Sequence, residues 1–334
     1  MSTRNLSTNS NWGFNQTDKI ISFTSTELIK SYKKALDDIR VKLVNLSEAF
    51  KISGELTKAQ ATQFYRLSNM EQEIVDVMKP YLTANTEFLK DMSKVGFDSG
   101  YFTHGWAMDQ ASGLDLGYGM IDDTAVRAAT GISGDLLPMA GIMSDKEIKQ
   151  HAKVLKKAFV NYDKDSVRWI SEEIRQGIIK GESIPTITRR LKNSGMLKSL
   201  NSAELIARTE ILRSSGIGSQ ISYDDARNAG VQLSEIWDAT LDSRTRPSHA
   251  SADGTKMDNE TGMFDVLGGT PGPRRTGNAS DDINCRCRSV AEVEGYSPEL
   301  RNIRGEGLQP YQTFKNWATD KGYTVNRYGQ KYNF

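Results

Sequence analysis

The sequence predicts an α+β protein, with a mainly α-helical N-terminal region and a small C-terminal α+β module. Apolar residues recur at helical spacing from Ser25 to Ala226, with charged residues on the opposite faces. Strand-like alternation of apolar and polar residues follows only afterwards, in residues 231–237 and more loosely in 285–293. A run of helices followed by a few strands is typical of the α+β class.

The expected helices begin and end at recognisable signals. Ser25 can cap a long amphipathic helix, and a second helix that reaches Pro80 would pair with it as a helical hairpin. Gly181 is a stop signal, and Ser183 with a proline two residues later is a start signal. We expect helices over residues 25–46, from 56 to 80 and beyond, from 144, and over 165–181, 183–191 and 202–226.

Four segments follow from this pattern. Residues 1–22 are rich in Ser, Thr, Asn and Gln and lack apolar periodicity, which indicates a flexible N-terminal arm. Residues 23–140 form a helical region, in which glycines and aromatic residues between 95 and 137 should interrupt regular structure. Residues 141–294 combine further helices with the small sheet, and residues 295–334 form an aromatic and basic tail.

The composition is lean in apolar residues and nearly neutral in charge. Hydrophobic residues make up 37% of the 334 residues, and 43 lysines and arginines almost balance 42 aspartates and glutamates. A net charge of +1 gives no global attraction to nucleic acid or anionic membranes, so any such binding must be local. No apolar run approaches the ~18 residues of a membrane span, and the start lacks the apolar core of a secretory signal. We expect a cytosolic protein without membrane contact.

The tail interleaves basic and aromatic side chains. Such side chains can stack on bases and neutralise phosphates, so the tail could bind DNA or dock on a partner protein. It could equally fold back on its own domain. Its interleaved basic residues include Lys315, Lys321, Arg327 and Lys331.

The only two cysteines and one histidine form a candidate metal site. On a strand, Cys285 and Cys287 would point to the same face. If the long loop brings His249 close, three soft or borderline ligands meet, and Asp242 or Asp253 could supply a fourth to a zinc ion. The alternative is a pair of small buried thiols in a core strand.

The turn that contains Asp242 also has the composition of a structural latch. Asp242 could cap backbone amides or pair with a guanidinium, and Arg244 and Arg246 could pair with carboxylates such as Glu210. Glu210 and Arg208 lie among apolar neighbours on a helix, which predicts a partly buried pair. The predicted latch residues are Arg208, Glu210, Trp237, Asp242, Arg244 and Arg246.

A catalytic alternative uses the same residues. Aspartate, histidine and arginine beside a metal are the groups that phosphodiester hydrolysis needs. A hydrolase would show more acidic ligands or a second nearby histidine, and we therefore assign no catalytic residue. His104 lies among aromatic and small residues, which favours a packed or hydrogen-bonded histidine, and His151 falls on the polar face of a helix.

These residues also carry a family resemblance, which covers about residues 165–293. The sequence resembles the phage Mu F-like head morphogenesis family, the minor head proteins of tailed bacteriophages. Four separated blocks occur in the family's order, and no one of them would suffice alone. The blocks are Ala207-Arg208-Thr209-Glu210, Trp237 with Asp242 to Arg246 and His249, Asp253-Gly254 with Phe264, and Asn284-Cys285-Arg286-Cys287-Arg288.

The resemblance implies a structural and interaction role in the phage head. It implies a minor capsid component, present in few copies in the procapsid and associated with the portal, the scaffold or the major capsid protein. It implies localisation in the virion, after assembly in the host cytoplasm, and in some members contact with DNA or ejection with it. The alternative from another class is a metal-dependent nuclease or effector that acts on nucleic acid.

Overall fold

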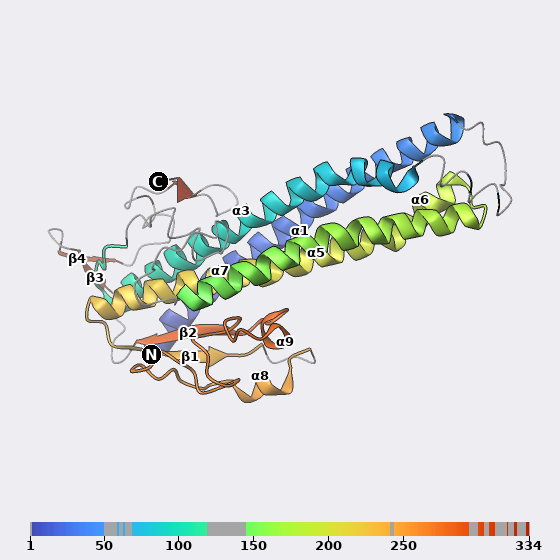
Figure 1. The fold of residues 1–334 in the computed structure, drawn as a ribbon. Coiled ribbons are helices and arrows are strands. Elements are labelled where there is room, and N and C mark those ends of the chain that lie inside the picture. Colours follow the sequence, from blue (N-terminus) through green and yellow to red (C-terminus); the bar gives the residue numbers. More distant parts are fainter. Residues whose placement is uncertain are drawn as a thin grey trace. The chain divides into compact units, whose positions relative to one another are not determined.

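The computed structural model describes residues 2–49, 69–118, 145–240, 244–293, 300–303, 307–310, 324–325 and 332–333, and the single residues 59, 63 and 319. Within them, the predicted mainly helical fold with a small α+β module is confirmed (Figure 1). The helices are α1 (Ser2–Ala49), α3 (Met70–Ser112), α5 (Asp145–Ile179), α6 (Ile184–Asn193) and α7 (Gly195–Asn228). Among the described residues, no helix is both long and apolar enough to cross a membrane.

The strands form three antiparallel pairs. β1 (Leu233–Asp238) pairs with β2 (Arg288–Val293), in a register that places Trp237 opposite Ser289. The loop between these two strands carries the short helices α8 (Pro247–Ser251) and α9 (Ala279–Asp282). Within the predicted tail, β3 (Leu300–Ile303) pairs with β4 (Gly307–Pro310), and β5 (Thr324–Val325) with β6 (Tyr332–Asn333).

The chain divides into two compact units that interleave along the sequence. Unit 1 comprises Met1–Ser22, Asp91–Lys153 and Ala207–Phe334, and unit 2 comprises Phe23–Lys90 and Val154–Ile206. Each of the four long helices therefore contributes one part to each unit. The predicted boundaries at residues 140 and 294 lie outside the described residues, so these ranges stay a prediction.

Unit 2 has a buried hydrogen-bond network inside its apolar core. The hydroxyl of Tyr32 in α1 lies 2.6 Å from the hydroxyls of both Tyr162 in α5 and Ser199 in α7. Asn85 in α3 donates its side-chain N–H to the Tyr162 hydroxyl at 3.3 Å. Buried polar groups are tolerated when they are hydrogen-bonded to one another, so this network joins four helical segments at a defined register.

In unit 1, α3 packs on α7 through glycines. A Cβ atom on Gly100 would collide with the carbonyl oxygen of Ser215, and one on Gly218 with the carbonyl oxygen of Phe97. A Cβ atom on Gly96 would lie 2.8 Å from the carbonyl oxygen of Ile211. The absence of side chains lets the two backbones approach closely, and the buried aromatic residues pack on either side. These aromatic residues include Phe97, Tyr101, Phe102, Trp106, Tyr118 and Tyr223.

Two predictions about helices are wrong in unit 1. The expected flexible arm over residues 1–22 is the first part of α1, because Phe14 and Ile20 are buried and Trp12 packs edge-on against Trp106 at 5.3 Å. The expected interruption from residue 95 does not occur before Ser112, since the glycines there mark helix–helix contact. The predicted continuation to residue 137 lies largely outside the described residues.

Other predictions agree with the structure. The break at Gly181 is present, with φ of 68°, and Ser183 is the N-cap of α6 with a proline in the first turn. His104 is buried, and its Nδ1 lies 2.9 Å from the carbonyl oxygen of Gly100 and 3.0 Å from the hydroxyl of Ser219. Burial lowers the pKa of His104 to about 4, so this packed and hydrogen-bonded histidine is neutral at pH 7.

Gly100→Ala should destabilise the protein, although alanine is the better helix former. The added Cβ collides with backbone of α7, and overpacking of this kind costs about 1–3 kcal/mol. Gly216→Ala in α7 is the matched control, because its nearest new contact is Arg274 Nη2 at an ordinary 3.5 Å. There helix propensity should dominate and raise stability by up to about 1 kcal/mol. Urea unfolding followed by circular dichroism measures the free energy of unfolding of both variants. Equal stability of the two variants would contradict the close contact between α3 and α7.

Candidate metal centre

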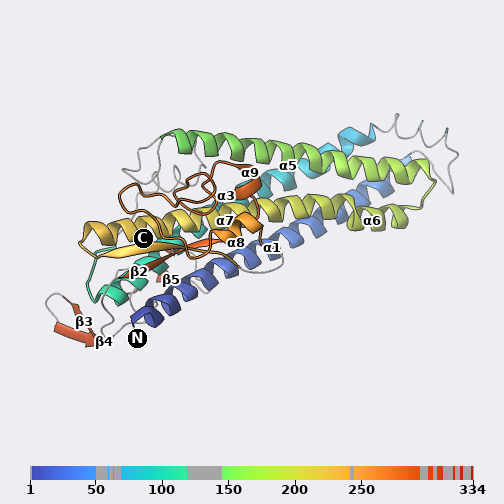
Figure 2. The same ribbon diagram turned by 90° about the horizontal axis from the view of Figure 1, so that it is seen from below.

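The candidate metal ligands lie near the two ends of the loop between β1 and β2, and the fold of the loop brings them together. His249 lies on α8, which starts with Pro247 in its first turn, and Cys285 and Cys287 directly precede β2 (Figure 2). The cysteines are therefore not on the strand itself, but their alternation still buries both and leaves Arg286 half-buried between them.

Three side chains meet in the interior of this module. His249 Nδ1 lies 3.4 Å from Cys287 Sγ and 3.5 Å from Cys285 Sγ, although the residues are 38 and 36 positions apart in the sequence. The donor atoms of all three residues lie within 4.8 Å of one another. Each residue is only 2% exposed. Among the described residues, this is the one group of His, Cys, Asp or Glu side chains whose arrangement could hold a metal ion.

The two cysteines are electrostatically unequal. The pKa of Cys285 is lowered to about 5, first because the Cys287 thiol donates a hydrogen bond to its sulfur, and further by the charge of Arg274. The same pairing raises the pKa of Cys287, since a second thiolate beside the first is unfavourable. The pKa values of the two cysteines are therefore shifted in opposite directions by one shared interaction.

An apolar shell surrounds the three side chains. Trp237 in β1 is fully buried, and its ring packs edge-on against Phe264 at 5.6 Å and against His249 at 6.2 Å. On the far side of the imidazole, His249 Nε2 lies 3.7 Å from an oxygen of Asp281 on α9. The histidine thus faces two sulfurs with one nitrogen and a carboxylate with the other.

Arg274 is the residue that fastens this cluster to the helices. Its Nη1 donates to the carbonyl oxygens of Cys285 at 3.2 Å and Cys287 at 2.6 Å, and its Nη2 donates to that of Leu212 in α7 at 3.0 Å. Arg274 is 4% exposed and has φ of 63°, a backbone conformation that residues other than glycine rarely adopt. The next residue, Arg275, pairs with Glu147 of α5 at 2.8 Å.

The predicted latch residues have other partners than expected. Glu210 is buried but pairs with His151 at 3.0 Å, whereas Arg208 is exposed, so the two do not form a buried pair. Burial alone would raise the pKa of Glu210, but the nearby charges of His151, Arg213 and Arg274 lower it.

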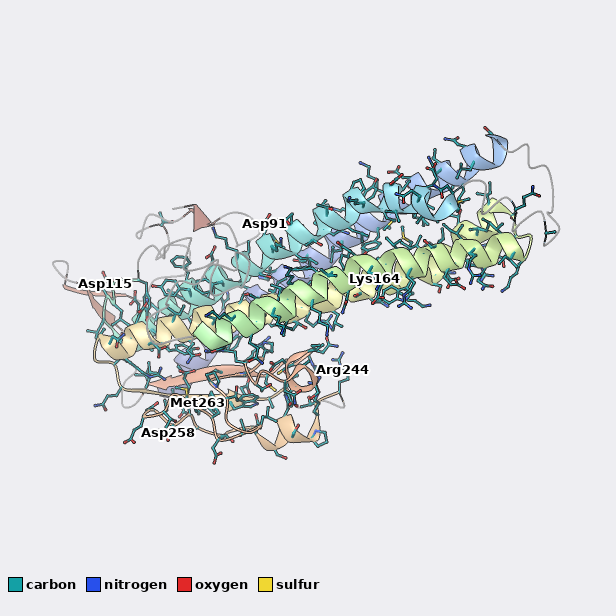
Figure 3. The ribbon with its side chains drawn as sticks, in the orientation of Figure 1. Asp91, Asp115, Lys164, Arg244, Asp258 and Met263 are labelled. Carbon is teal, nitrogen blue, oxygen red and sulfur yellow. The ribbon has the colours of Figure 1, made fainter. Side chains whose placement is uncertain are left out.

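Among the described residues, the hydrogen-bond partners of Arg246 in the predicted latch turn are backbone carbonyl groups and not Glu210. Arg246 donates to the carbonyl oxygen of Ile283 at 2.6 Å, and Arg244 is an exposed residue of the turn (Figure 3). Asp253 accepts a hydrogen bond from the Ala239 amide at 2.8 Å. Asp242 lies outside the described residues, so its roles as latch and as fourth ligand stay predictions.

Sequence reasoning missed Arg274, Asp281 and His151. Arg274 follows Pro271-Gly272-Pro273, a pattern that indicates an exposed turn, and no local signal shows that its side chain is buried. Asp281 had a usable signal, because Asn278 caps α9 and an acidic residue three positions later is typical of a helix start. His151 lies on the helix α5, and only the fold shows that it faces Glu210.

Arg274→Lys should destabilise the module strongly. A lysine ammonium cannot reach three carbonyl groups in the fixed geometry of a guanidinium, and each buried carbonyl left without a donor costs about 1–3 kcal/mol. The control is Arg244→Lys at the exposed turn, where we expect a change within about 0.5 kcal/mol. Thermal unfolding and limited proteolysis of the loop measure the effect, and similar losses for both variants would contradict this role of Arg274.

Comparison with known proteins agrees with the resemblance found in the sequence. Residues 168–290 match the family model described as Phage Mu protein F like protein. The chain is 27% identical over 292 residues to the Minor head protein GP7 of Bacillus phage SPP1, which covers 86% of this chain and 88% of that protein. No solved structure matches the chain.

A second relative has a different kind of name. The chain is 25% identical over 300 residues to the NAD(+)--arginine ADP-ribosyltransferase EFV of Enterococcus faecalis. The match covers 89% of this chain but only 57% of that relative's length. The stretch that matches the family model, residues 168–290, includes His249 and both cysteines, and over this stretch the chain is similar to the phage Mu F-like family.

Proposed function

We propose that the protein is a minor head protein of a tailed phage that acts through protein contacts during procapsid assembly near the portal. The observation that carries this proposal is its similarity to the minor head protein of phage SPP1, which extends along 88% of that protein rather than through the shared module alone. The expected partners are the portal protein and the scaffold or major capsid protein. The long helices would supply the contact surfaces, and the small module would brace them.

The geometry of the cysteine cluster supports a structural role over the nuclease alternative. A catalytic zinc site keeps one coordination position open to water and substrate. His249, Cys285 and Cys287 are each 2% exposed and packed under Trp237, so a metal ion there would be closed to a nucleic acid. Incubating the protein with supercoiled plasmid and divalent metals tests the alternative, and cleavage lost in His249→Ala but kept in His151→Ala would favour it.

The similarity to the ADP-ribosyltransferase does not by itself bring that activity to this chain. The match leaves a large part of that protein uncovered, since it spans 57% of its length. Incubation with labelled NAD+ and an arginine-containing acceptor is the direct assay. We expect no transfer above that of a heat-unfolded sample, and transfer by the native protein would instead assign an enzymatic function.

The protein should be present in purified phage heads and needed for infectivity. Deleting its gene from the phage or prophage that encodes it should lower the infectious titre, and a plasmid copy should restore it. Mass spectrometry of purified heads tests whether the protein is present in them. To identify the partner, the protein is co-expressed with the portal, the scaffold or the major capsid protein in turn, and each mixture is analysed by size-exclusion chromatography. Heads that lack the protein, together with an unchanged titre, would contradict the proposal.

Binding of DNA by the tail is a separate prediction. The basic residues Lys315, Lys321, Arg327 and Lys331 lie outside the described residues, so their changes are chosen from the sequence. Replacing all four with glutamine should weaken DNA binding and make the slope of log K against log salt shallower by about 3 to 4 if each contacts a phosphate. Gel shifts at several salt concentrations measure the slope.

The matched control for the tail replaces four exposed lysines of α5 with glutamine. These are Lys149, Lys153, Lys156 and Lys157. The control removes the same charge, and so separates a local site from general electrostatic attraction. Equal losses in the two variants, or none in the tail variant, would exclude the tail as the DNA-binding segment.

A further inference from the structure

The two nitrogen–sulfur distances among the three buried donors match those of ligands around one zinc ion. With Zn–S bonds of about 2.3 Å and Zn–N bonds of about 2.0–2.1 Å, a tetrahedral site holds a nitrogen and a sulfur about 3.5 Å apart. The two separations measured from His249 Nδ1 to the cysteine sulfurs are 3.4 and 3.5 Å. We propose that His249, Cys285 and Cys287 bind one structural zinc ion that holds the β1–β2 loop closed.

The carboxylate behind the imidazole supports this assignment. In zinc sites a ligating histidine usually donates its other ring N–H to a carboxylate or carbonyl, which fixes the tautomer and the ring orientation. Asp281 is the nearby carboxylate, with an oxygen 3.7 Å from His249 Nε2, and it would have to move slightly closer to accept a hydrogen bond from that nitrogen. With the proton on Nε2, Nδ1 presents its lone pair to the ion. Asp281 is therefore a positioning residue for the metal ligand.

A divalent cation would offset the charge that two thiolates bring to this site. Two thiolates and the Asp281 carboxylate bring three negative charges into a largely buried region, and Arg274 supplies one positive charge beside both cysteines. A Zn2+ ion supplies the other two. Each sulfur would coordinate as a thiolate, so zinc binding would release the thiol protons.

The ligand types select zinc among the common divalent ions. Thiolate sulfur is a poor ligand for magnesium and calcium, which prefer oxygen, whereas two thiolates with an imidazole suit zinc. The enclosed position of the ligands indicates a structural ion. Its effect would be to join α8 to the residues that enter β2, in addition to the contacts that Arg246, Arg274 and the Trp237 core already make across the loop. The inference does not depend on a role in the phage head.

Metal analysis of the full chain tests the proposal. The protein is produced with zinc in the medium, purified under reducing conditions and analysed by mass spectrometry for metals. We expect one zinc ion per chain, and a lower unfolding temperature after chelation that added zinc restores. Exchange for Co2+ should produce the thiolate-to-cobalt absorption and the d–d bands of a tetrahedral sulfur-containing site. These measurements need no variant, so they stand even if a ligand change prevents folding.

Variants then identify the ligands. His249→Gln and the double change Cys285→Ser with Cys287→Ser should abolish zinc binding, while His151→Gln, which changes a histidine of the same unit outside the cluster, should retain it. Asp281→Asn should keep the cobalt spectrum but lower zinc affinity about 10- to 100-fold. Reduced wild-type protein without stoichiometric zinc after incubation with the ion, or a folded double cysteine variant that still binds it, would overturn the proposal. An unchanged affinity in Asp281→Asn would overturn the positioning role.

Discussion

The buried guanidinium of Arg274 is the interaction on which the C-terminal module depends. It donates to one carbonyl group of α7 and to the carbonyl groups of both cysteines, so it fixes the start of β2 against a helix. A buried charge without partners would cost several kcal/mol, and here hydrogen bonds to three carbonyls offset that cost. Its left-handed backbone conformation is retained because the surrounding contacts define it.

The helical part of unit 1 provides the rigid support that such a buried charge requires. α3 and α7 approach so closely at Gly100 and Gly218 that each backbone excludes a side chain on the other. This contact fixes the position of Leu212, the carbonyl acceptor that Arg274 uses on α7. A wider or looser helix pair would leave the guanidinium with an unfilled donor, since close packing transmits small displacements. The glycines and the arginine therefore act on the same part of the structure.

The sequence predicts these features to different degrees, for physical reasons. The break at Gly181 and the start at Ser183 were predictable because capping depends on local residues. The proximity of His249 to the cysteines could be predicted for two reasons. Cys285 and Cys287 alternate along the chain and so point to the same side, and the loop that carries His249 must return to the strand that follows them. The glycines of α3 predict an interruption of the helix when only the sequence is considered. Their actual role, close contact with the backbone of α7, depends on a neighbouring helix that local sequence does not show. The N-terminal part of α1 is not predictable from its mostly polar composition, because the packing of Trp12, Phe14 and Ile20 is what holds it as a helix. The role of Arg274 is not predictable because no local pattern indicates that a residue after a Pro-Gly-Pro segment is buried.

A zinc–thiolate cross-link would not depend on an oxidising environment. A disulfide between distant residues does not persist in a reducing cytosol, and this chain has no distant cysteine pair that could form one. Zinc joins thiolates and an imidazole without oxidation, so it could close the loop under reducing conditions. Because both cysteines are only 2% exposed, oxidants would reach their sulfurs slowly. On this view the histidine and cysteines contribute cohesion to the module, and the same burial that protects the ligands is what separates the site from a catalytic centre.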